Sequence, residues 1–179
     1  MPDIAGLKLI VPTSVAGSGV SVSASGKVTF TAATTVSVNG CFTASYDNYL
    51  VVIRSNASTA LEIQMRLRVS GTDNSTASSY TRQQLAADNT SVDGERVSSN
   101  ITRFLPAYAT QRVGGHAYFY GPALAQPTAV RCVNVSDSSS AFIRDYAITH
   151  NQSTAYDGFS LIPDSGNITG ALTIYGLSQ

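Results

Sequence analysis

The sequence predicts an all-β fold, an antiparallel, jelly-roll-like β-sandwich of roughly ten to twelve strands. Apolar side chains alternate with polar ones through residues 61–70, and this period of two is typical of a strand with one buried face. Turn-forming Gly, Asn, Asp and Pro separate the apolar segments at intervals of about 8–12 residues. Helix-capping signals are absent from most of the chain.

The first half begins with residues 1–6, which we expect to form a short tail before one sandwich domain at residues 7–179. The Asn39-Gly40 pair predicts a hairpin leading into a strand that starts at Cys41, because both residues accept positive φ. Tyr49–Ile53 is almost continuously apolar and predicts a central strand buried on both faces. The other strands predicted here cover residues 7–11, 20–23, 27–31, 36–38 and 60–70.

The second half begins irregularly. Residues 76–112 give strand candidates only at 80–85 and 95–105, with one helical turn at most at 83–87, and we expect much of this region to form exposed or interface loops. Clear alternation then returns. It predicts strands at residues 116–120, 129–135, 141–149, 159–162 and 168–175, with a turn at 137–140.

Charge is sparse and balanced in this chain. Lys and Arg number 11, Asp and Glu also number 11, and charged residues make up only 12% of the total. Without a basic face we expect no nucleic-acid partner. Near-zero net charge protects weakly against association, so we expect a homo-oligomer. No apolar run approaches the ~18 residues of a membrane span, and the apolar segment at 7–11 is too short for the core of a signal peptide.

Reactive groups are few. The only histidines are His116 and His150, and no Gly-x-Ser-x-Gly motif accompanies them, so the sequence predicts no catalytic site. Most carboxylates lie in turns, whereas Glu62 and Asp145 lie in clearly predicted strands. No metal-ligand spacing or phosphate-binding glycine motif is present, so we expect no metal or cofactor. A Ca²⁺ ion at a loop such as Asp73-Asn74 stays an open alternative.

Cysteines are also few. Cys41 and Cys132 both lie in strand-like segments, where a free thiol behaves as a small buried apolar group. A disulfide between them stays open and would require that their strands lie side by side.

Surface recognition is the remaining possibility. Tyrosines in polar surroundings suit interfaces and sugar platforms, because each offers a rigid apolar body and one hydrogen-bonding group. A polar loop follows the strand at 60–70, and one histidine shares a face with two tyrosines in the strand at 116–120. The candidate interface or recognition residues are Thr72, Asp73, Asn74, Tyr80, Tyr108, His116, Tyr118 and Tyr120.

Several short motifs along nearly the whole chain carry a family resemblance. They include Gly26-Lys27-Val28-Thr29-Phe30, Asn39-Gly40-Cys41-Phe42, Tyr46-Asp47-Asn48-Tyr49, residues 66–74, Tyr120-Gly121-Pro122, Tyr156-Asp157-Gly158-Phe159 and Ile174-Tyr175-Gly176. In these motifs the chain resembles small structural proteins of tailed bacteriophages, of the minor tail or tail-fibre-like type. The resemblance brings no catalytic residues with it.

The resemblance implies a non-enzymatic structural protein of the virion, made in the host cytoplasm, which acts as a minor tail protein or as a tail-tip or knob protein. Its partners would be other virion proteins and further copies of itself, with a homotrimer expected by analogy with phage knobs. Two alternatives stay open. One is a capsid decoration or head-fibre protein, and the other is a carbohydrate-binding module that recognises a host-surface glycan.

Overall fold

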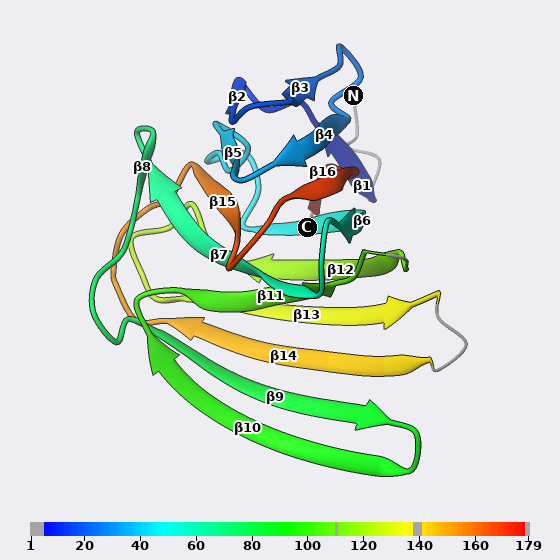
Figure 1. The fold of residues 1–179 in the computed structure, drawn as a ribbon. Coiled ribbons are helices and arrows are strands. Elements are labelled where there is room, and N and C mark those ends of the chain that lie inside the picture. The colour runs from blue at the N-terminus through cyan, green and yellow to red at the C-terminus, as the bar shows by residue number, and fades with distance from the viewer. Residues whose placement is uncertain (1–5, 110, 138–140, 178–179) are drawn as a thin grey trace.

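The computed structural model describes residues 6–109, 111–137 and 141–177, and these residues form 16 strands and no helix. All the strand pairs are antiparallel, and they form two sheets that face one another (Figure 1). The predicted all-β sandwich is therefore confirmed. Residues 1–5 of the expected tail and residues 138–140 of the expected turn lie outside the described residues.

The large sheet has ten strands in the order β10-β9-β14-β13-β12-β6-β16-β4-β3, with β1 paired to β16 beside β4. Its strands are β1 Leu7–Ile10, β3 Val20–Val22, β4 Val28–Ala33, β6 Asn48–Ala57, β9 Tyr80–Asp88, β10 Ser91–Ser99, β12 Val113–Tyr120, β13 Thr128–Ser136, β14 Phe142–His150 and β16 Ile168–Leu177.

The small sheet has six strands in the order β11-β7-β15-β5-β2, with β8 paired to β7. They are β2 Ser14–Ala16, β5 Val36–Asn39, β7 Leu61–Val69, β8 Thr72–Asp73, β11 Thr102–Ala107 and β15 Gly158–Pro163. Its edge strand β11 contacts β12, β13, β14 and β9, so the small sheet covers the middle of the large one. The β9–β10 hairpin lies at the far edge of the large sheet (Figure 1).

One apolar core fills the space between the sheets. Phe42, Phe119 and Phe159 meet at its centre with ring centroids 5.2–5.8 Å apart. The alternation predicted at 60–70 is confirmed in β7, where Leu61, Ile63, Met65 and Leu67 face this core. Burial of such side chains is the main favourable contribution to folding.

The strand count exceeds the prediction mainly in two places. Residues 76–112 are not loop-rich: they hold the β9–β10 hairpin, which turns at Asn89-Thr90, and then β11, and no helical turn forms at 83–87. Few of their side chains are apolar because most of β10 is exposed, and this hid the strands. The other additional strands, β2 and β8, are three and two residues long and too short to show a period, whereas β3 matches the strand predicted at 20–23.

Two further expectations are wrong. Asn39-Gly40 does not form a hairpin, because β5 lies in the small sheet and the next strand, β6, in the large one; Gly40 does adopt a positive φ of 61°. β6 is central in its sheet, but its outer face is not fully buried, since Val52 is 42% exposed. An apolar run in a strand therefore does not show that both faces of the strand are buried.

Candidate interaction surface

The outer face of the large sheet, which points away from the core, is unusually apolar. Of the ten large apolar side chains that are exposed in the described residues, all but Val11 and Leu124 belong to strands of this sheet and point outward. The eight are Leu7, Leu9, Val52, Leu85, Val92, Tyr120, Val135 and Ile143. Apolar groups gathered in this way on a protein surface are typical of an interaction site.

Strand register places these side chains in rows that run across the sheet. One row contains Arg54, Gly114, Val135, Ile143, Ala87 and Val92, on β6, β12, β13, β14, β9 and β10. The next row contains Val52, His116, Val133, Asp145, Leu85 and Gly94 on the same strands. The third contains Leu50, Tyr118, Arg131, Ala147, Gln83 and Arg96. Neighbours within a row point to the same side, so they form one continuous surface.

An aromatic ladder runs along β12 on this face. The rings of His116 and Tyr118 lie 5.8 Å apart edge-on, and those of Tyr118 and Tyr120 lie 6.3 Å apart and nearly parallel. His116 and Tyr120 are exposed and Tyr118 is half-buried. Three of the sequence-predicted recognition residues are therefore brought together.

Small residues leave shallow hollows beside the ladder. Gly114 opens a hollow of about 560 Å³ with largely apolar walls, lined among others by Val52, His116, Val133 and Val135. A second hollow of about 490 Å³ lies around Ala147 and is bordered by Leu85, Arg131 and Asp145. The outer face is thus uneven, with projecting side chains next to small ones.

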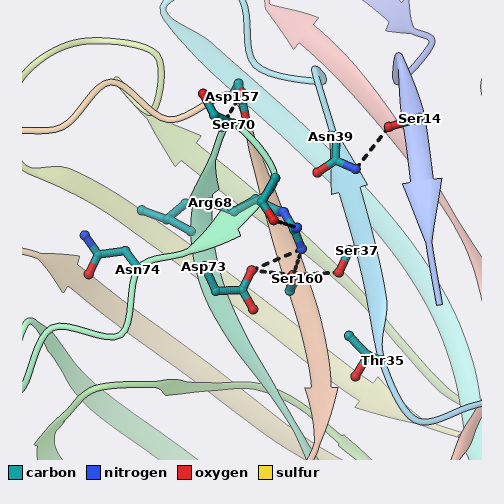
Figure 2. A network of polar contacts seen from close by, with 12 residues as sticks. Ser14, Thr35, Ser37, Asn39, Arg68, Ser70, Asp73, Asn74, Asp157 and Ser160 are labelled. Atoms are coloured by element: carbon teal, nitrogen blue, oxygen red, sulfur yellow. Dashed lines mark hydrogen bonds and ion pairs between the residues drawn. The ribbon is translucent and has the colours of Figure 1, made fainter.

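Of the other predicted residues, Tyr80 and Tyr108 pack in or against the core between the sheets. Thr72 and Asp73 form β8 of the small sheet and Asn74 follows directly, and Figure 2 shows Asp73 and Asn74 near Arg68. There Arg68 donates from Nη1 to Ser160 Oγ (2.5 Å) and forms an ion pair with Asp73 (3.1 Å), and it also donates to the carbonyl of Gly71. Ser160 donates to Asp73 (2.7 Å) and shares a hydrogen bond with Ser37 (3.0 Å). Arg68, Ser37 and Ser160 are buried. We call this set the Arg68 network.

A second set of contacts continues from Asn74, whose amide donates to Tyr156 Oη (2.8 Å). Tyr156 Oη in turn bonds His150 Nε2 (2.5 Å), and Tyr80 stacks on the His150 ring at 4.1 Å. Tyr80 also donates to the carbonyl of Asn74 and accepts from the amide of Leu67. These bonds attach the segment 70–75 to the sheet.

The predicted residues therefore separate into two groups. Tyr80 is only 1% exposed and serves packing, so it is not accessible to a partner, and Tyr108 is half-buried against Phe142 (5.8 Å). Asp73 and Asn74 are engaged within the chain, and Thr72 is exposed. The residues that sequence reasoning missed are Leu85, Val133, Val135 and Ile143, whose outward direction depends on which sheet each strand joins.

The side chains that could take part in acid-base or nucleophilic chemistry are largely buried. Burial lowers the pKa of His150 to about 4, so its imidazole is neutral near pH 7. Cys41 and Cys132 are unpaired and buried, which answers the open disulfide question, and burial raises the pKa of both thiols. Glu62 lies where burial raises its pKa and nearby Arg103 opposes the shift. Such buried thiols are inert rather than reactive.

Across residues 6–109, 111–137 and 141–177, no three His, Cys, Asp or Glu side chains gather as a metal site. The same part of the chain holds no helix long and apolar enough to cross a bilayer.

No protein-family model matches the chain. The curated proteins give no match either.

Proposed function

We propose that the protein is a non-enzymatic structural protein of a tailed-phage virion, and that it acts as a minor tail or tail-tip protein through contacts with virion proteins and with further copies of itself. One observation carries the structural part of this proposal: eight of the ten exposed large apolar side chains of the described residues gather on the outer face of the large sheet. The resemblance in the turn and strand motifs carries the virion part.

The arrangement of the chemical groups supports a role in binding rather than catalysis. His150 is enclosed by Tyr80 and Tyr156, and His116 lies on an open sheet face with Val52 and Val133 as its register neighbours. A general base needs a proton to abstract within hydrogen-bond reach, and an enclosing pocket for the reacting group. Neither histidine has such a setting among the described residues.

The test is the protein content of purified phage particles. Mass spectrometry of virions, with immunogold labelling in the electron microscope, should find the chain in the particle, at the tail and in a small number of copies. A copy number close to that of the capsid subunits, with label on the head, would favour the decoration protein instead. Absence of the chain from purified particles would contradict both.

A glycan-binding role is the second candidate, and the aromatic ladder favours it. Tyr118 and Tyr120 form a pair of nearly parallel rings at a spacing suited to stacking sugars. A glycan array should then give hits that the double variant Tyr118→Ala with Tyr120→Ala loses. An array without hits, together with unchanged attachment to cells by the double variant, would remove this candidate.

A further inference from the structure

We propose that a second copy of this chain docks on the outer face of the large sheet, related to the first by a two-fold axis that runs along β13. The face from β16 to β10 then packs on itself, as the two layers of a sandwich do. This inference does not depend on the virion assignment. A dimer can form whether or not the chain belongs to a phage.

Size complementarity across β13 is the main argument. On β12 the small residue is Gly114 and the large one is Tyr118; on β14, in the same two rows, the large residue is Ile143 and the small one is Ala147. A two-fold axis along β13 lays β14 of the second copy over β12. Ile143 of that copy then enters the hollow at Gly114, while Tyr118 projects over the small Ala147 of that copy.

The strands farther from the axis match in the same way. Leu85 on β9 of the second copy lies over Val52 on β6, because both belong to the row of Val133. Val92 on β10 of the second copy lies over Ala171 on β16. On the axis itself, Val133 and Val135 meet their own counterparts. Val92 is 69% exposed and Leu85 56% in the single chain, so both have much surface to bury.

Charge on the face is complementary as well. Arg131 donates to Asp145 of its own chain, with Nη2 2.6 Å from Oδ2, and these residues occupy adjacent strands and adjacent rows. The two-fold axis puts Asp145 of the second copy on the other side of Arg131. Two guanidinium groups and two carboxylates then form a neutral cluster at the axis. Arg131 also faces its own counterpart on the axis, and the two Asp145 carboxylates offset the repulsion between these guanidinium groups.

The available area is sufficient for a stable contact. Seven strands spaced about 4.8 Å apart, each contributing about eight residues at about 3.3 Å per residue, cover roughly 900 Å². Stable interfaces bury about 800 Å² on each partner. A sheet face of this size and apolar character meets that requirement with one further copy.

Sedimentation of the full chain over a range of concentrations tests the proposal. We expect a reversible dimer of twice the 18.7 kDa chain mass. A species that stays monomeric at high concentration, or a trimer, would overturn it. The fate of the virion proposal is decided separately by particle composition, so the two failures are distinguishable.

Filling either small position should then weaken the dimer. A Cβ added at Gly114 meets no atom within 4 Å, so Gly114→Leu is accommodated in the single chain but occupies the place of Ile143 from the second copy. We expect the dissociation constant to rise roughly tenfold or more. Ala147→Leu, on an exposed strand position, should act alike by displacing Tyr118. Circular dichroism verifies that each variant folds.

A size exchange gives the sharpest result. Gly114→Ile combined with Ile143→Ala moves the large side chain from β14 to β12, and a two-fold contact along β13 should regain most of the affinity that Gly114→Ile alone loses. The two positions are separated by β13 within one chain, so recovery requires contact between copies. Val11→Asp, at an exposed apolar position directly after β1 and outside the strands β16 to β10 of the contact, is the matched control and should leave the dimer intact. A dimer that Gly114→Leu does not weaken would contradict this interface.

Discussion

The outer faces of the two sheets differ in the kind of side chain they carry and in how exposed it is. The outer face of the small sheet carries buried polar groups, Arg68, Ser37 and Ser160, and the β7–β8 hairpin of the same sheet supplies partners for them through Gly71 and Asp73. The outer face of the large sheet carries exposed apolar groups, and within the described part of the chain no segment supplies it with partners in this way.

The difference shows that the side chains on a sheet face depend on what contacts that face. A polar group is buried at low cost only when it is hydrogen-bonded, so a face covered by its own chain can be polar where the covering segment provides acceptors. A face that a separate molecule covers gains most from apolar area that leaves water on association. On this reasoning the small sheet is complete in one chain and the large sheet is completed by another molecule.

The largest effect on stability should come from disrupting the Arg68 network of the small sheet. Arg68→Ala removes the donor to Ser160 and Gly71 and the ion-pair partner of Asp73, and it should lower the free energy of unfolding by about 3–4 kcal/mol in urea denaturation. Arg54→Ala is the matched control. Its side chain is largely exposed beside Asp137 (3.7 Å), so we expect a change within about 0.5 kcal/mol. Equal losses in the two variants would refute the contrast.

Low pH should destabilise the folded chain through His150. The folded pKa of His150 is about 4, below the ordinary 6.5, so between these values the unfolded chain binds a proton that the folded chain excludes. The stability due to neutral His150 is full above pH 6.5 and falls by about 3 kcal/mol as the pH drops toward 4.

Denaturation across this pH range, compared with His150→Gln, isolates the effect from that of the carboxylates. The variant should lose most of the slope, whereas His116→Gln, at an exposed position, should keep it. A wild-type slope that His150→Gln leaves unaltered would mean that this histidine is not buried as described.

Removing one hydroxyl should have a smaller effect. Tyr156→Phe deprives the Asn74 amide and His150 Nε2 of a partner at 2.8 and 2.5 Å, and we expect a loss of about 1–2 kcal/mol in the free energy of unfolding. Hydrogen exchange should show faster opening of residues 70–75 in this variant. An unchanged exchange rate in residues 70–75 would show that the hydrogen bonds of Tyr156 do not hold this segment in place.

The smallest effect on the single chain should come from the open face. Ile143→Thr, measured by denaturation below the concentration at which copies associate, should alter the free energy of unfolding by no more than about 0.5 kcal/mol. The same variant should raise the dissociation constant of the dimer. A large loss in the isolated chain would show that Ile143 supports the fold instead of an interface.

Local patterns predicted the strands where one face is buried and the other wet, as in β7, and they predicted the ladder of His116, Tyr118 and Tyr120 because side chains two apart share a face. They failed at β10, whose exposed side chains show no apolar period, and at Asn39-Gly40, where the chain crosses between sheets. Tyr80 resembled a surface residue, but β9 turns it toward His150. Strand order is a long-range property, so the rows that unite Gly114, Val135 and Ile143 had no local signal.

Hydroxyl-radical footprinting at a low and a high protein concentration tests most directly whether a second copy covers the large sheet. Leu85, Val92, Tyr118 and Ile143 should react readily when the protein is dilute and be protected when it is concentrated, while Val11 and Leu124 react equally in both. Equal reactivity of the large-sheet residues at both concentrations, in a sample that sedimentation shows to be associated, would place the contact elsewhere.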